Sequence, residues 1–262
     1  MLQYFGDMGN SLIKAAALDF GAQWACWAVA AALRTEKFYD LAGSGTFFLL
    51  AWQSLKWGNT FHPRQRVATG MVMAWACRLG MYLFTRILKD GKDRRFNNVR
   101  DKPGVFLAYW TIQGVWVMST LLPVLMLNSK KEDKPVSTRD YIGWALWALG
   151  FFFEAVGDYQ KSAFRANPDN AGMFIQHGLW SLCRHPNYFG EILMWTGLYI
   201  TSSKALSGFE HISIISPIFL SFLLTQVSGI PLLEKYASKK WGSNPQYQLY
   251  VKNTAKLVPY IW

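Results

Sequence analysis

The sequence is poor in charged residues and above all in acidic ones. Charged residues make up 16% of the 262 residues, against about 25% in an ordinary soluble protein. Only 16 Asp and Glu oppose 27 Lys and Arg, which leaves a formal net charge of +11. The three cysteines are too few, and odd in number, for a disulfide scaffold. Because 52% of the residues are hydrophobic, a disordered chain is excluded as well.

Several sequence motifs of soluble enzymes are also missing. The chain has no G-x-G-x-x-G and no P-loop, so neither common nucleotide-binding fold is supported. The four histidines form no H-x-x-x-H or H-E-x-x-H pattern, and no cysteine pair has metal-ligand spacing, so we expect no metal site. No serine lies in the G-x-S-x-G context of a hydrolase nucleophile.

What the chain does contain is a series of long apolar stretches separated by short basic loops. A bilayer core of about 30 Å requires about 20 helical residues, and several of the stretches reach that length. We therefore predict an all-α, polytopic helical membrane protein with about seven transmembrane helices, although six or eight passes stay open. The predicted spans are 12–33, 40–57, 68–88, 104–127, 140–157, 187–203 and 211–233.

A soluble helical bundle is the competing interpretation, and the modest mean hydropathy favours it. The apolar stretches nevertheless lack the wide polar stripe of a helix in water. In 140–157, for example, the only charged residues are Asp140 and Glu154. We therefore expect one integral membrane domain over residues 1–262, whose partner is the lipid bilayer and not nucleic acid.

The distribution of basic residues predicts the orientation of the chain. Lys and Arg concentrate in the loops after the first, third and fifth spans and in the C-terminal tail. The positive-inside rule places these segments in the cytosol. We therefore expect a cytosolic C-terminus, in the endoplasmic reticulum or another intracellular membrane.

Four polar residues fall at or near membrane depth. Polar and ionisable groups are costly there and are functional candidates by default, or else they are paired inside the helix bundle. Arg78 is the strongest functional candidate of the four, which are Asp19, Arg78, Gln113 and Glu154.

The region between Glu154 and Trp195 carries the densest set of chemical groups. Asp158 and Arg165 share one face of a helix that continues the fifth span. Asn167-Pro168 then ends this helix, because the residue before a proline avoids the α conformation. The alternative to a functional role is ordinary ion pairing at a solvated helix end.

A second helix begins at Pro186, directly after Arg184 and His185. The free N–H groups of a helix start, flanked by these two residues, suit an anion such as phosphate. The alternative is a helix cap at the membrane interface, where both side chains contact lipid headgroups. The polar residues on the following turns are Asn187, Tyr188 and Glu191.

The C-terminal tail from Pro231 onward reads as an amphipathic cytosolic helix followed by a closing loop. Its basic and aromatic residues suit an anionic leaflet, and this role is expected for Lys239 and Lys240. Glu234 and Tyr250 could additionally close over a cofactor.

These residues carry a family resemblance. The stretch Gly178-Leu-Trp-Ser, followed by Arg184-His-Pro-Asn-Tyr-Phe-Gly-Glu191, resembles the signature of the steroid 5α-reductase-like membrane proteins, in particular an uncharacterised, domain-of-unknown-function branch. Further similar segments extend over nearly the whole chain: 34–43, 78–86, Gln113-Gly114 and Pro231-Leu-Leu-Glu234. The wider superfamily includes sterol C14 reductases and isoprenylcysteine carboxyl methyltransferases.

The resemblance implies a cytosolic C-terminal cofactor-binding part, residues 140–262, which in the reductases holds NADPH. Asp158, Arg165, Asn187 and Glu191 match the cofactor-binding positions of the family, and the remaining motif residues are Arg184, His185 and Tyr188. The characterised reductases also use a Glu in the second helix and a Tyr in the third. Here the second span offers only Gln53, and the third offers Arg78 and Tyr82.

Three functional hypotheses follow. The first is an NADPH-dependent reductase of a hydrophobic, enone-bearing lipid or sterol, in which Arg78 or Tyr82 polarises the carbonyl or donates the proton. The second is methyl transfer from S-adenosylmethionine, with Glu234 as cofactor ligand. The third is a non-catalytic structural subunit that binds partner subunits of a membrane complex. A thermal-shift comparison of the two cofactors separates the first two hypotheses.

Overall fold

A computed structural model describes residues 2–261, and every regular element within them is a helix. This agrees with the predicted all-α class. The chain forms two compact units. The first unit comprises the chain up to Asp140 together with Tyr199–Ser216, and the second comprises Tyr141–Leu198 and the chain from Pro217 onward.

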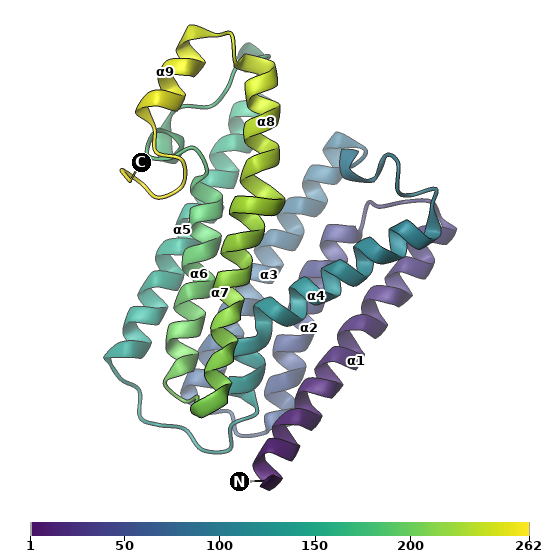
Figure 1. Ribbon diagram of the computed structural model, residues 1–262, viewed down its shortest axis with the longest axis vertical. Coiled ribbons are helices and arrows are strands. Elements are labelled where there is room, and N and C mark those ends of the chain that lie inside the picture. The colour runs from purple at the N-terminus through teal and green to yellow at the C-terminus, as the bar shows by residue number, and fades with distance from the viewer. Residues whose placement is uncertain (1, 262) are drawn as a thin grey trace. The chain divides into compact units, whose positions relative to one another are not determined.

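The first unit is built on four long helices, which Figure 1 shows in purple to teal. α2 packs against α1, α3 and α4, and α1 packs against α4. Aromatic rings fill the space between them, because the Phe47 ring lies 4.9 Å from that of Trp75 and 4.8 Å from that of Trp116. The helices are α1 (Leu2–Ala32), α2 (Tyr39–Gly58), α3 (Pro63–Asp90) and α4 (Pro103–Asn128), with a short 3-10 helix η1 (Arg94–Phe96) before α4.

A hydrogen-bonded polar cluster lies buried among α1, α2 and α4. Gln113 donates from Nε2 to Gln23 Oε1 at 2.9 Å. Gln23 Nε2 in turn lies 3.4 Å from both Asp19 Oδ1 and Thr46 Oγ1. Asp19 and Gln113 are thus paired with other polar groups inside the helix bundle, which is the alternative to a functional role at membrane depth.

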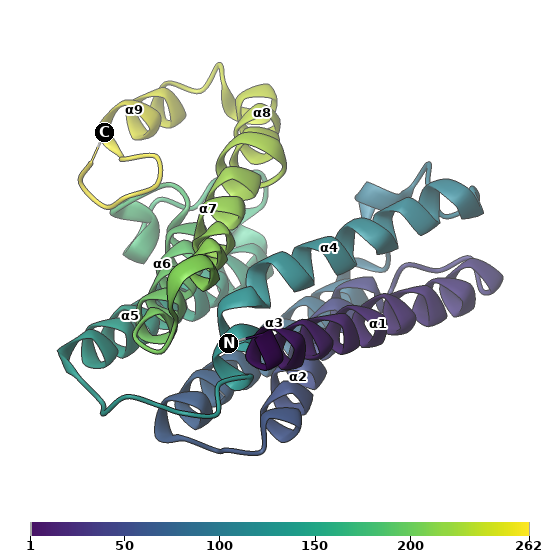
Figure 2. The ribbon, with the colours of Figure 1, turned by 60° about the horizontal axis from the view of Figure 1, so that its bottom comes forward.

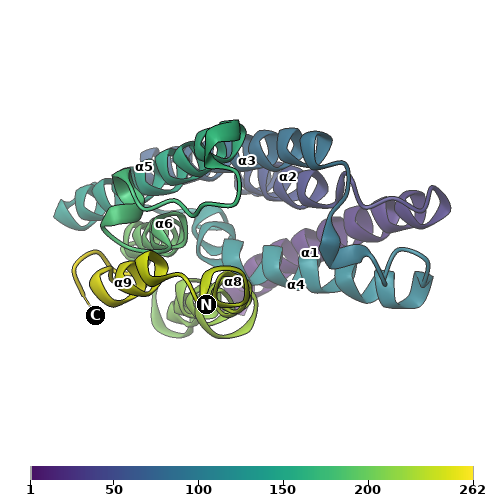
Figure 3. The same cartoon turned by 90° about the horizontal axis from the view of Figure 1, so that it is seen from above.

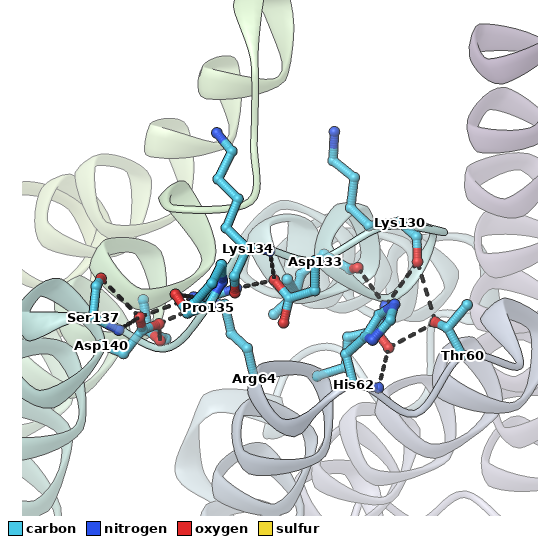
Figure 4. Close-up of polar contacts among 12 residues, drawn as sticks. Thr60, His62, Arg64, Lys130, Asp133, Lys134, Pro135, Ser137 and Asp140 are labelled. Atoms are coloured by element: carbon cyan, nitrogen blue, oxygen red, sulfur yellow. Dashed lines mark hydrogen bonds and ion pairs between the residues drawn. The ribbon is translucent and has the colours of Figure 1, made fainter.

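A buried arginine ties the α4–α5 loop to the start of α3. The Arg64 guanidinium is fully buried, pairs with Asp133, and lies 2.6 Å and 2.9 Å from the two carboxylate oxygens of Asp140 (Figure 4). Asp140 also accepts hydrogen bonds from Ser137 and from Thr201. Nearby, Lys130 and Glu210 form a second buried ion pair.

The second unit contains most of α5 (Thr138–Ala166) and α6 (Pro186–Ser203), which run side by side in Figures 2 and 3. Glycines spaced seven residues apart allow their backbones to touch. A Cβ at Gly150 would lie 2.5 Å from the Gly190 carbonyl oxygen, and a Cβ at Gly197 would collide with the Gly143 carbonyl. Small residues at such an interface permit close helix packing within a membrane.

The remaining elements of the chain are shorter. α6 is followed by the 3-10 helix η4 (Gly208–Ile214) of the first unit, then by α7 (Ile215–Phe222), a π-helical turn η5 (Leu223–Val227) and α8 (Gly229–Trp241). α9 (Pro245–Asn253) precedes the C-terminal tail. Two 3-10 helices, η2 (Pro168–Asn170) and η3 (Gly178–Ser181), lie between α5 and α6.

Three helical segments are long and apolar enough to cross a membrane by length and composition. They are Pro63–Asp90, Pro103–Asn128 and Gly208–Trp241. The other four predicted spans lie along α1, α2, α5 and α6. The ends of α2 are close to the predicted 40–57, whereas α1 begins at Leu2, well before the predicted 12, and α5 continues to Ala166, beyond the predicted 157. That these four also cross the membrane stays a prediction.

Candidate functional site

The candidate site is a pocket in the second unit, built between the end of α5, the segment after it, α8 and α9. Its cavity volume is about 110 Å³, which is smaller than the ~300–1,000 Å³ of typical small-molecule sites. All of its lining residues fall within the predicted cofactor-binding part. They are Lys161, Phe164, Arg165, Met173, Phe174, Ile175, Trp180, Arg184, His185, Leu233, Glu234, Tyr236, Ala237, Trp241, Tyr247 and Tyr250.

The segment that follows α5 is held against this helix by residues of its own sequence, and it forms one side of the pocket. Asn167 and the following proline end α5 as predicted, and Asn167 Oδ1 accepts a hydrogen bond from the Asp169 backbone N–H at 3.0 Å. Gly178 has a φ of +62°, and a Cβ there would collide with the Gln160 side chain. The Trp180 indole then donates to the Gly157 carbonyl at 3.0 Å, which holds its ring beside the pocket.

The C-terminal tail is fastened to the Arg184 segment. The Arg184 backbone N–H donates to the Ala255 carbonyl at 2.9 Å, and its guanidinium Nη1 donates to the Val251 carbonyl at 3.1 Å. The Tyr250 hydroxyl donates to the Trp180 carbonyl at 2.7 Å. These contacts bring α9 over the pocket, although α9 is far from Arg184 in sequence.

Glu234 lies at the centre of the polar groups in the pocket. Its Oε1 is 2.8 Å from His185 Nε2, and its Oε2 is 3.3 Å from Arg184 Nη2. His185 is nearly buried, and its ring stacks on Tyr188 at 5.9 Å between centroids. Burial lowers the pKa of His185, and this outweighs the opposing effect of Glu234. The imidazole is therefore neutral at pH 7.

Two buried nitrogen atoms of this group have no hydrogen-bond partner among the described residues: Arg184 Nε and His185 Nδ1. If the neutral imidazole donates to Glu234 from Nε2, its Nδ1 is a free acceptor. Cys183, directly beside them, is no nucleophile, because burial raises the pKa of its thiol to about 11.

The structure brings together five of the predicted site residues and leaves the others elsewhere. Arg165, Arg184, His185, Glu234 and Tyr250 line the pocket. The other predicted cofactor residues are absent from the described lining. Asn187 donates to Asp158 at 3.1 Å, Tyr188 packs against Gly229, and Glu191 lies one turn further along α6.

The two predicted catalytic residues belong to the first unit. The Arg78 guanidinium lies 5.8 Å from the centre of the Tyr82 ring, and Arg86 lies 5.9 Å from the same ring. Their catalytic role stays a prediction.

Apart from Tyr250, the aromatic walls of the pocket were not predicted from the sequence. The Phe174 ring lies 5.1 Å from that of Tyr247, 5.6 Å from that of Tyr250 and 5.8 Å from that of Trp241. Lys161 lies 4.5 Å above the Trp180 ring. The high density of aromatic residues in the C-terminal tail was the sequence feature from which these walls could have been predicted.

Comparison with known proteins supplies three findings. Residues 26–254 match a family described as "Protein of unknown function (DUF1295)". A curated protein of Ustilaginoidea virens, "Probable O-methyltransferase ustE", is 29% identical over 154 residues, which is 52% of this chain and 51% of that relative. The chain thus spans about half the relative's length. No solved structure matches. Because the family match covers most of the sequence, the chain belongs to the DUF1295 family, a steroid 5α-reductase-like membrane family.

Proposed function

We propose that the chain is a membrane enzyme that transfers a methyl group from S-adenosylmethionine to a hydrophobic acceptor. The observation that carries this proposal is Glu234, held between Arg184 and His185 in an aromatic pocket. The match to a protein named as an O-methyltransferase supports it. The bound cofactor would supply an electrophilic methyl group.

The side chains of the pocket fit that cofactor. The aromatic rings of Phe174 and Tyr250 are surfaces on which an adenine stacks, and they also attract a sulfonium cation. Arg184 and Arg165 suit the carboxylate of the methionine part. Glu234 suits its ammonium group.

The chain's own residues would then bind and orient, and His185 could hold a proton. Its neutral imidazole leaves Nδ1 as the acceptor, so His185 could take a hydrogen bond from the ligand without carrying charge into the pocket. Tyr250, whose pKa is raised by burial, stays protonated and keeps its hydrogen bond to Trp180.

A reductase that uses NADPH is the second candidate, because the pocket has an excess of positive charge. Lys161, Arg165 and Arg184 line it against the single carboxylate of Glu234. Three cationic side chains suit the phosphates of a dinucleotide. Arg78 and Tyr82 would then act on the substrate carbonyl, as the family resemblance implies.

For either chemistry we propose seven membrane passes with the pocket on the cytosolic side, in an intracellular membrane such as the endoplasmic reticulum. The structure has helices of at least 18 residues at all seven predicted spans: α1 to α6, and Gly208–Trp241. Both cofactors are cytosolic solutes, and the basic loops are placed on that side by the positive-inside rule.

A thermal-shift experiment on the purified protein tests the proposal. S-adenosylmethionine at about 100 times its Kd should stabilise the protein by about 2.7 kcal/mol, whereas NADPH at the same concentration should have no effect. Arg165→Ala should weaken the shift, and Arg66→Ala, which replaces an exposed arginine of α3, should not. Stabilisation by NADPH alone would favour the reductase. No response to either cofactor, with co-purifying subunits, would favour the structural role.

A further inference from the structure

The chain becomes uniformly basic after the pocket glutamate. From residue 235 to the C-terminal end the sequence contains no Asp or Glu, and its five charged side chains are Lys235, Lys239, Lys240, Lys252 and Lys256. All five lysines are exposed, and Lys240 lies over the Trp241 ring at 4.7 Å.

α9 turns an apolar and basic face outward. Tyr247 is buried and Tyr250 points to the pocket, so both belong to the inner face of this nine-residue helix. Leu249 and Lys252, three residues apart, therefore share the opposite face. Leu249 is 59% exposed on that face.

The tail after α9 extends the same surface. The parallel bridge between Cys183 and Ala255 holds the chain beside the start of α6, and the tail returns next to α9 in Figures 1 and 3. Tyr260 and Ile261 are 75% and 65% exposed there. The exposed Leu249, Tyr260 and Ile261 thus flank Lys252 and Lys256 along this segment.

The seventh predicted span ends at residue 233, and the helix that contains it continues to Trp241, a few residues before α9 begins at Pro245. α9 presents one lysine, Lys252, and one exposed leucine, Leu249, and the tail adds Lys256, Tyr260 and Ile261. Basic and large apolar residues on one surface are the composition of an interfacial element. Positive charge without compensating acids matches an anionic leaflet.

We propose that residues 245–261 form a docking surface for anionic phospholipid headgroups, with Lys252 and Lys256 contacting the headgroups and Leu249, Tyr260 and Ile261 inserted beside them. This docking would hold α9, one wall of the pocket, against the bilayer. The inference does not depend on which cofactor the pocket binds.

Hydrogen exchange of the full-length protein in lipid nanodiscs tests the inference. Amides of 245–256 should be protected in discs that contain phosphatidylglycerol and should exchange faster in discs of phosphatidylcholine alone. Each lysine neutralised should lower this protection roughly fivefold, so Lys252→Gln with Lys256→Gln should remove most of it. Salt at 0.5 M should have the same effect on the wild type through screening.

A matched change elsewhere controls for the loss of charge. Lys134→Gln replaces an exposed lysine of the α4–α5 loop and should leave the protection of 245–256 unchanged. Amides of α8 report whether each variant is folded. Equal protection in both lipids, or protection that persists in the double variant with α8 intact, would overturn the proposal. Protection only after an acidic protein is added would assign the surface to a different partner.

Discussion

The negative charge of Glu234 should affect the binding of the two candidate cofactors in opposite directions. Among the described residues that line the pocket its carboxylate is the one acidic group, and it contacts both Arg184 and His185. An ammonium-bearing ligand gains from this charge, whereas a polyanionic ligand is repelled by it. Replacing the carboxylate by an amide of the same shape should therefore lower the affinity for one cofactor and raise the affinity for the other.

Glu234→Gln should weaken the binding of S-adenosylmethionine by roughly 10- to 100-fold, since a hydrogen bond to a charged group contributes about 1.5–3 kcal/mol. Isothermal titration of the purified protein measures this directly. The same variant should bind NADPH better than the wild type if the pocket is a dinucleotide site. The exposed Glu132, replaced by Gln, is the control for the loss of a carboxylate. Unchanged affinity for both cofactors would remove Glu234 from the site.

His185 should make stability depend on pH in a defined direction. Because burial lowers its pKa in the folded state, the unfolded chain binds the proton first as the pH falls. Neutral His185 therefore makes its full contribution to the free energy of unfolding above its ordinary pKa of about 6.5. Below that pH the contribution is lost, by at most about 1.4 kcal/mol per pH unit.

Thermal melts between pH 7.5 and 5.5 measure this slope. The wild type should lose more stability on acidification than His185→Gln, which cannot titrate at this position. The charged groups that act on His185 are Glu234, Arg184 and Lys161, so the comparison is made with all three unchanged. Identical slopes would show that His185 contributes nothing to the pH dependence.

At the level of single residues, the sequence located the polar groups of the site but not its walls. Arg184, His185 and Glu234 could be predicted, because a helix start after Arg-His-Pro is a local pattern. Phe174 and Trp180 could not, because their place beside α8 and α9 depends on Gly178 and on the return of the tail to Ala255.

Among the elements, the contact of α5 with α6 depends on glycine. Gly190 faces Gly150 so closely that a methyl group would touch the opposite backbone. This contact sets the position of Pro186 and hence of the Arg184 segment that precedes it.

Gly190→Ala should destabilise the protein by about 1–3 kcal/mol through overpacking. Gly45→Ala, inside α2, has open space around the new methyl group and should be neutral or stabilising by about 0.5–1 kcal/mol. Thermal melts of the two variants in one detergent provide the comparison. Equal melting temperatures would contradict the close contact of α5 and α6.

The start of α3 offers a second contrast between neighbouring residues. Arg64→Met leaves Asp133 and Asp140 without their buried cation, and we expect a loss of about 3–5 kcal/mol. Arg66→Met, two residues later and exposed, should change stability by less than about 0.5 kcal/mol. Chemical denaturation in mild detergent measures both, and a small effect of Arg64→Met would show that the network is dispensable.

The helix boundaries were largely predictable from local signals. Proline at 63, 103 and 186 begins α3, α4 and α6, and Asn167-Pro168 follows the end of α5. The ion pair of Lys130 with Glu210 was not, since it joins residues 80 positions apart. Apolar periodicity predicts where a helix lies in the sequence, but it does not predict which residues far along the chain the helix contacts.

For the whole molecule, the orientation in the membrane is the prediction with the widest reach. Lys134 and Lys252 should lie on opposite sides of the bilayer if the chain crosses it seven times. In a variant without Cys26, Cys77 and Cys183, a cysteine at 252 should react with an impermeant maleimide only from the cytosolic side. A cysteine at 134 should react only from the other side. Labelling of both positions from one side would exclude an odd number of crossings between them.

The path of the chain between its two units also has a consequence for synthesis. The first unit contains Tyr199–Ser216 in addition to its N-terminal helices, so the ribosome must complete α5 and most of α6 before that unit has all of its residues. The buried ion pair of Lys130 with Glu210 can therefore form only after α5 and α6 have been synthesised. Truncation at any single point leaves the first unit incomplete or removes part of the second. Completion of the first unit is thereby a late event of biogenesis, although its four long helices are made first.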